Sequence, residues 1–173
     1  MRVITGTARG KRLLALEGEA VRPTTDRVKE GMFSAIQFQV EGRSVLDLFA
    51  GSGQLAIEAL SRGAARAVLV DLAKDSLSVA EKNLVATGLL GKARLVRSDF
   101  ASYLLSCRET FDLAFLDPPY RTGMLQEALP LVVDRMNPGG SIFCEHPAEE
   151  LLPEKVGSFL KKKEYRYGKI LVT

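Results

Sequence analysis

The sequence contains no tryptophan, only one histidine and only two cysteines. Cys107 and Cys144 lie far apart, with His146 as the only further ligand type nearby, so their spacing matches neither a disulfide framework nor a zinc site. No apolar run is long enough to span a membrane, and the N-terminus lacks the apolar core of a signal peptide. These absences predict a cytoplasmic protein that needs no metal and no membrane.

The 173 residues suffice for one hydrophobic core, and nothing in the sequence demands more than a monomer. The net charge is only +3, but basic residues gather at both ends of the chain. This distribution suggests a polyanionic partner. The C-terminal run around Lys161–Lys163 suits solvated lysines on an edge strand equally well. Gly6 and Gly10 make the N-terminal run resemble a mobile basic hairpin, which favours nucleic acid as the partner.

The stretch Ser44–Gly53 indicates a buried strand followed by a glycine turn and a helix. Gly51, Gly53 and Ala56 match the dinucleotide-binding pattern, in which backbone N–H groups at the helix start face a ligand. The same glycines are also compatible with a simple strand-to-helix turn. Asp47 lies inside the apolar run, where an unpaired carboxylate is costly, so we expect a fixed cationic or N–H partner for it.

A second strand at 67–71 ends in Asp71, at the distance from the glycine turn where a ribose-binding acid is expected. The alternative is that Asp71 caps the following helix. Further strands are predicted at 93–97, 111–116 and 141–144, with helices at about 26–38, 55–62, 74–87, 100–105 and 124–136 and a weak one at 148–154. Hairpins are predicted at 2–14 and 159–173. This alternation predicts a doubly wound α/β fold with a mostly parallel sheet.

The fourth strand ends in Asp117-Pro118-Pro119-Tyr120. Two consecutive prolines rigidify the backbone and leave carbonyl oxygens without local N–H partners. The Asp117 carboxylate and a proline carbonyl can accept the two N–H bonds of a planar amine while the Tyr120 ring stacks on its heterocycle. A proline turn with a capping aspartate is the plainer alternative. If the first and fourth strands flank the reversal of strand order, this loop and the glycine turn face the same crevice.

The two core motifs resemble those of S-adenosylmethionine-dependent amino-methyltransferases, which methylate exocyclic amines of nucleic-acid bases. More particular stretches are similar to the bacterial family that forms N2-methylguanine in 16S ribosomal RNA. These stretches are Arg2-Val-Ile-Thr-Gly-Thr-Ala-Arg-Gly-Lys-Arg12, Arg22-Pro-Thr-Thr-Asp-Arg-Val-Lys-Glu30 and Glu58-Ala-Leu-Ser-Arg-Gly-Ala64. The resemblance covers nearly the whole chain. Gln54, where a small residue is usual, and Lys169, where an aspartate is common, depart from the pattern.

The resemblance implies a Rossmann-like class I methyltransferase with seven strands, an antiparallel last strand and a small N-terminal hairpin. It divides the chain into a basic extension, residues 1–21, and a methyltransferase domain, residues 22–173. The implied activity is transfer of a methyl group from S-adenosylmethionine to the N2 amine of a guanine. The implied partner is 16S ribosomal RNA or the assembling small ribosomal subunit.

The resemblance also implies a role for each site residue. Asp117, Pro118, Pro119 and Tyr120 would hold the amine. Asp47, Phe49, Gly51, Gly53, Asp71, Asp99, Phe100, Thr24, Thr25 and Arg27 would bind the cofactor, the last three at its methionine carboxylate. Arg2, Arg9, Lys11, Arg12 and Arg22 would contact phosphates. From the sequence alone, Arg27 is equally suited to an ion pair with Asp26 or Glu30.

Three other functions fit part of the pattern. A DNA adenine-N6 methyltransferase also uses Asp-Pro-Pro-Tyr, but such enzymes usually carry a separate target-recognition domain, for which this chain has no room. A nicotinamide-dependent oxidoreductase accounts for the glycines but not for Asp117–Tyr120. A non-catalytic RNA-binding assembly protein with a vestigial cofactor fold is disfavoured by the intact acids Asp47, Asp71, Asp99 and Asp117.

Overall fold

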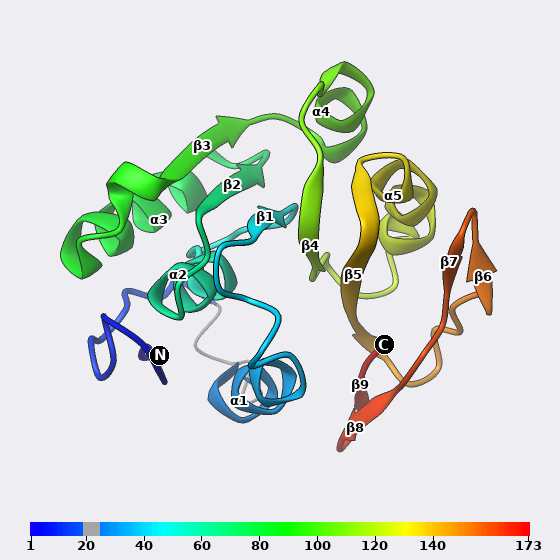
Figure 1. Cartoon of the computed structure of the whole chain (residues 1–173), viewed down its shortest axis with the longest axis horizontal. Coiled ribbons are helices and arrows are strands. Elements are labelled where there is room, and N and C mark those ends of the chain that lie inside the picture. Colours follow the sequence, from blue (N-terminus) through cyan, green and yellow to red (C-terminus); the bar gives the residue numbers. More distant parts are fainter. Residues whose placement is uncertain (19–24) are drawn as a thin grey trace.

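A computed structural model, which describes residues 1–18 and 25–173, contains a seven-stranded sheet in the order β3-β2-β1-β4-β5-β9-β8 (Figure 1). β1 to β5 are parallel, whereas β9 runs antiparallel to both β5 and β8. The predicted doubly wound sheet with an antiparallel last strand is therefore confirmed. The strands are β1 (Ser44–Asp47), β2 (Arg66–Asp71), β3 (Ala93–Arg97), β4 (Phe111–Leu116), β5 (Met136–Pro147), β8 (Tyr165–Tyr167) and β9 (Ile170–Val172).

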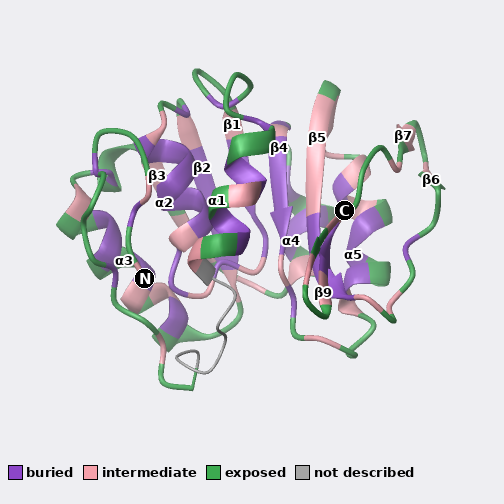
Figure 2. Cartoon of the chain, turned by 90° about the horizontal axis from the view of Figure 1, so that it is seen from below, coloured by how far each residue is buried: buried purple, intermediate pink, exposed green. Residues whose placement is uncertain are grey.

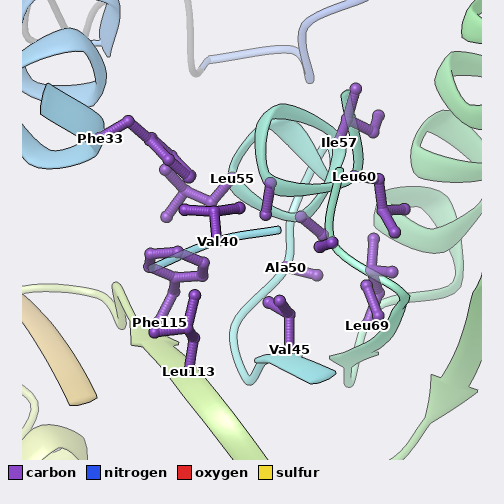
Figure 3. Close-up of a cluster of buried hydrophobic side chains, with 14 of the residues drawn as sticks. Phe33, Val40, Val45, Ala50, Leu55, Ile57, Leu60, Leu69, Leu113 and Phe115 are labelled. Atoms are coloured by element: carbon purple, nitrogen blue, oxygen red, sulfur yellow. The ribbon is translucent and has the colours of Figure 1, made fainter. Parts of the chain in front are cut away.

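Helices cover both faces of this sheet, because successive side chains of each inner strand point to opposite faces and nearly all are apolar. Val45 joins the core beneath α1, α2 and α3 (Figure 3), whereas Leu46 joins the core beneath α4 and α5. Figure 2 shows the central strands buried between these layers. The helices are α1 (Thr25–Ala35), α2 (Gln54–Ser61), α3 (Lys74–Thr87), α4 (Phe100–Ser106) and α5 (Met124–Val133).

Several predicted boundaries are wrong, most of them at the C-terminal side of the fold. α5 ends at Val133. Met136, predicted as its last residue, and residues 137–140, predicted to stop it, are part of the 12-residue strand β5. The Asn137 Nδ2 donates a hydrogen bond to Asp112 Oδ1, 3.0 Å away, which holds this stretch against β4. Residues 148–154 form no helix. The hairpin predicted at 159–173 is shorter: β8 pairs with β9, whereas β7 (Phe159–Leu160) pairs with β6 (Lys155–Val156) in a separate hairpin. α1 ends at Ala35 rather than near residue 38.

The N-terminal segment is anchored on α2, so the prediction of a mobile hairpin is wrong. Its two predicted strands are reduced to one antiparallel bridge between Arg2 and Arg12. The Ile4 N–H donates to Glu58 Oε2 at 3.0 Å, and the side chain of Glu58 is fully buried. Gly6 approaches α2 so closely that a Cβ there would lie 1.8 Å from the Ser61 carbonyl oxygen. Because the segment covers its outer side, α2 is buried all around, including Glu58, which lies outside the apolar stripe of Leu55, Ala56, Ala59 and Leu60.

Candidate functional site

A cavity of about 660 Å³ opens at the carboxyl ends of β1 and β4. These strands are neighbours, and the chain continues from β1 to β2 on one side and from β4 to β5 on the other, so strand order reverses between them. Ligands of open α/β sheets bind at this position. The glycine turn after β1 and the Asp117 loop after β4 line the same cavity, as the sequence predicted.

The glycine turn depends on backbone conformations that other residues rarely adopt. Gly51 has φ 54° and Gly53 has φ 81°, both in the left-handed region. A Cβ on Gly53 would lie 3.0 Å from Leu69 Cδ2 and 3.2 Å from Ala80 Cβ, so the turn is also pressed against β2 and α3. The turn therefore brings the start of α2 to the cavity wall.

Asp47 is buried at the end of β1 and has the N–H partner that the sequence predicted. Its Oδ2 accepts a hydrogen bond from the Ala56 N–H at 3.1 Å. Burial raises the pKa of Asp47 to about 7; the Ala56 N–H opposes that rise, and the nearby charge of Asp71 adds to it. Asp47 lines the cavity, so a cation bound there would offset the cost of its negative charge.

Asp71 connects β2 to the glycine turn. Its Oδ2 accepts the Gly51 N–H at 2.9 Å, and its Oδ1 accepts the Ala73 N–H at 2.9 Å. Ala73 occupies the N-cap position of α3, so Asp71 itself is not the N-cap residue. A carboxylate has about four lone-pair positions, and Asp71 thus retains capacity for hydroxyl donors from the cavity that it lines.

Asp99 and two aromatic rings form another part of the cavity wall. Asp99 is the N-cap of α4, where its Oδ1 accepts the Ser102 N–H at 2.8 Å. This N–H holds the pKa of Asp99 below its ordinary value and fixes the carboxylate as an acceptor. The rings of Phe49 and Phe100 pack with their centroids 5.6 Å apart. The cavity lining also includes the exposed side chain of Leu72.

The loop after β4 is held by its own residues and by β5. Asp117 and Pro119 line the cavity, Pro118 is buried and Tyr120 is half-buried. The Pro119 carbonyl accepts a hydrogen bond from Thr122 Oγ1 at 2.8 Å. The Tyr120 hydroxyl donates to Glu145 Oε1 at 2.7 Å, which fixes the ring relative to β5.

Two charged residues of the cavity wall were not predicted. Lys29 of α1 is 1% exposed, and its Nζ donates to the Arg2 carbonyl oxygen at 2.6 Å. Desolvation lowers the pKa of Lys29. Lys29 lies within the apolar stripe of α1, beside Val28, and this position in the sequence pattern could have predicted its burial. Glu145 follows the rule already used for Asp117, since it lies at the carboxyl end of a parallel strand.

The remaining predicted residues lie elsewhere. Arg27 is exposed and is not among the residues that line the cavity, and Asp26 is 3.9 Å from Lys29 Nζ. Thr25 begins α1, but its side chain, like all of Arg22 and Thr24, lies outside the described residues. The basic residues of the N-terminal segment are exposed and make no ion pair with any described residue; they are Arg2, Arg9, Lys11 and Arg12.

Other features of the described residues are structural. His146 is buried, with its Nε2 2.8 Å from Thr173 Oγ1. Cys107 and Cys144 are buried and not joined to each other. Within residues 1–18 and 25–173, no group of three or more His, Cys, Asp or Glu side chains is placed to hold a metal ion. None of the helices in this part of the chain is long and apolar enough to cross a membrane.

Comparison with known proteins agrees with this architecture. The ribosomal RNA small subunit methyltransferase D of Escherichia coli (strain K12) is 36% identical over 172 residues, which cover 98% of this chain and 86% of that protein. Its namesake from Haemophilus influenzae is 32% identical and covers 94% of this chain and 88% of its own length. A solved structure from Escherichia coli, yhhF, is 36% identical with a TM-score of 0.88, covering 99% of this chain and 94% of that one.

More distant structures share the fold alone, among them SMU.776 complexed with SAH, at 19% identity and a TM-score of 0.68. Residues 1–173 match the family model described as Conserved hypothetical protein 95. This match and the methyltransferase relatives argue against the alternative of a nicotinamide-dependent oxidoreductase. The chain has the class I methyltransferase fold. It belongs to the Conserved hypothetical protein 95 family, to which the ribosomal RNA small subunit methyltransferase D proteins also belong.

Proposed function

We propose that this protein transfers a methyl group from S-adenosylmethionine to the exocyclic N2 amine of a guanine in 16S ribosomal RNA. The observation that carries the proposal is that one cavity is lined both by the glycine turn and by the Asp117 loop. The turn suits the cofactor, and the loop suits a planar amine. The relatives named ribosomal RNA small subunit methyltransferase D support ribosomal RNA as the substrate class.

The residues present fit the cofactor. The Oε1 of Gln54 is buried, lines the cavity and accepts no hydrogen bond from a described residue, so a bound donor such as an ammonium group would satisfy it. Asp47 would lie near the same ammonium. Asp71 would accept the ribose hydroxyls, and Asp99 the adenine amino group beside Phe100. When bound, the cofactor supplies an electrophilic methyl group on a sulfonium.

The turn and its surroundings complete this assignment. Phe49, Gly51 and Gly53 would hold the cofactor through packing and backbone groups. Thr24, Thr25 and Arg27 stay predictions for its carboxylate. Because Arg27 is exposed outside the cavity, it would need to move to reach that position. Among the described lysines and arginines, Lys29 is the one that lines the cavity.

The loop after β4 would prepare the amine for attack. The lone pair of a guanine N2 amine is delocalised into the ring, so the free amine is a poor nucleophile. Acceptors at both N–H bonds favour a pyramidal nitrogen and stabilise the positive charge that develops there. Asp117 would be one acceptor. A proline carbonyl of the same loop would be the other. The Tyr120 ring would stack on the base, which must leave its own stack.

Phosphate contacts would come from the N-terminal segment. Its exposed basic residues and Arg22 are our candidates, because anchoring on α2 holds that segment beside the cavity, which Met1 and Lys29 line. An anchored basic surface positions the RNA without ordering a mobile arm on binding. The substrate would be 16S ribosomal RNA, alone or in an assembling small subunit.

The test is transfer of labelled methyl from S-adenosylmethionine to three substrates, followed by digestion to nucleosides. The substrates are naked 16S RNA, small ribosomal subunits whose RNA lacks this methyl group, and unmethylated duplex DNA. We expect N2-methylguanosine from an RNA substrate. N6-methyladenine in DNA would keep the chemistry and overturn the substrate. Absence of transfer to all three, with cofactor binding intact, would favour a non-catalytic RNA-binding protein.

A further inference from the structure

Glu145 lies beside Asp117 at the carboxyl edge of the sheet. The register pairs Leu116, the last residue of β4, with Cys144 of β5, so the residues that follow them, Asp117 and Glu145, lie next to each other where β4 ends. Parallel strands lie about 4.8 Å apart. Leu116 and Cys144 both point into the core beneath α4 and α5, so the alternation directs the next residues to the opposite face. Both acids line the cavity.

The side chain of Glu145 is 7% exposed, which is unusual for a carboxylate. Its Oε1 accepts the Tyr120 hydroxyl at 2.7 Å. A single hydroxyl donor satisfies only part of a carboxylate's acceptor capacity, and Oε2 accepts no hydrogen bond from a described residue. A buried acceptor beside the amine-binding loop is therefore placed to receive a further donor from the base.

We infer that Glu145 selects guanine by accepting the N1–H of the target base, an inference that rests on the proposed function. Guanine presents N1–H next to its N2 amine, so two neighbouring groups on this edge are donors. Adenine presents the N1 lone pair next to its N6 amine. Asp117 and a proline carbonyl of the loop accept from the amine in either base, whereas a second carboxylate accepts from guanine and repels the adenine lone pair. A site built for a hydrogen bond rejects a base that lacks it more strongly than apolar packing does.

The test uses a short RNA whose unpaired target guanine is replaced by 2,6-diaminopurine. That base keeps the N2 amine but carries an N1 lone pair in place of N1–H. For the wild-type protein we expect kcat/KM to fall by about 100-fold or more on this replacement. In Glu145→Gln, the amide Oε1 still accepts from Tyr120 and the amide N–H can donate to N1. We expect this variant to reduce the preference for guanine by at least about 10-fold.

Tyr120→Phe is the matched control, because it removes the hydroxyl bound to Glu145 and keeps the ring. We expect it to lower kcat/KM for both RNAs by the same factor. If Glu145→Gln also lowers both equally, or abolishes both, Glu145 only positions Tyr120 and the inference is overturned. Competition binding of the two RNAs to the wild-type protein requires no variant, and equal affinities would overturn the inference as well. A wild-type protein that forms no N2-methylguanosine would instead overturn the proposed function itself.

Discussion

Replacing Asp47 by asparagine should stabilise the fold and weaken the cofactor site at the same time. The Asp47 carboxyl is buried, and its pKa is raised from 3.8 to about 7. Between those values the unfolded chain releases a proton that the folded protein keeps, so the free energy of unfolding falls as pH rises through this window. Asparagine retains an oxygen to accept the Ala56 N–H and cannot ionise. It should therefore remove this loss of stability.

The magnitude follows from the interval between the two pKa values. Each pH unit within it is worth about 1.4 kcal/mol, so the full gain above pH 7 is about 4 kcal/mol. Part of that interval lies below pH 5. The difference in the free energy of unfolding between Asp47→Asn and wild type should therefore widen by about 2.5 kcal/mol from pH 5 to pH 8.

The assay is urea unfolding of both proteins at pH 5, 6, 7 and 8 without cofactor. Glu81→Gln, which neutralises an exposed carboxylate of α3, controls for the general effect of charge and should give a nearly constant difference. If the difference for Asp47→Asn is equally constant, Asp47 ionises as it does in water and our account of its burial is refuted. Titration with S-adenosylmethionine should show about 10-fold weaker binding to Asp47→Asn, because the carboxylate no longer faces the ammonium.

Three further changes test the loop, the basic surface and the buried lysine. Asp117→Ala should lower the rate of methyl transfer by about 100-fold or more while S-adenosylmethionine affinity stays within a few-fold; an equal collapse in a binding titration would make Asp117 a cofactor residue. Alanine at the three basic residues of 9–12 should reduce the slope of log K against log salt by about two, and an unchanged slope would exclude phosphate contacts. Lys29→Met removes the hydrogen bond to the Arg2 carbonyl, so hydrogen exchange should become about 10-fold faster at the amides of residues 1–13 but not in β1 or β4. An equal change in the exchange rate in all of these segments would show that Lys29 does not anchor the N-terminal segment.

Local sequence patterns predicted the order of elements and the edge of the sheet at which the site lies. Apolar runs of strand length alternate with helical patterns, and this alternation suffices for a doubly wound sheet because parallel strands need crossover helices. Glycine permits backbone conformations that other residues rarely adopt, and proline restricts φ and lacks an N–H. The turn after β1 and the loop after β4 could therefore be predicted from the sequence. The need of Asp47 for a partner could be predicted as well, since burying an unpaired carboxylate inside an apolar run is costly.

The tertiary structure alone decided which polar groups meet. Glu58 lies outside the apolar stripe of α2, and only the docking of residues 1–13 buries that side of the helix. Lys29 reaches the Arg2 carbonyl, and Tyr120 reaches Glu145, across separations that no local periodicity encodes. β5 begins at Met136, where Asn137 binds Asp112 of β4, although the local pattern predicted that a helix reaches residue 136. Propensity and spacing describe neighbours along the chain, whereas burial, pKa and hydrogen-bond partners depend on segments that only folding brings together.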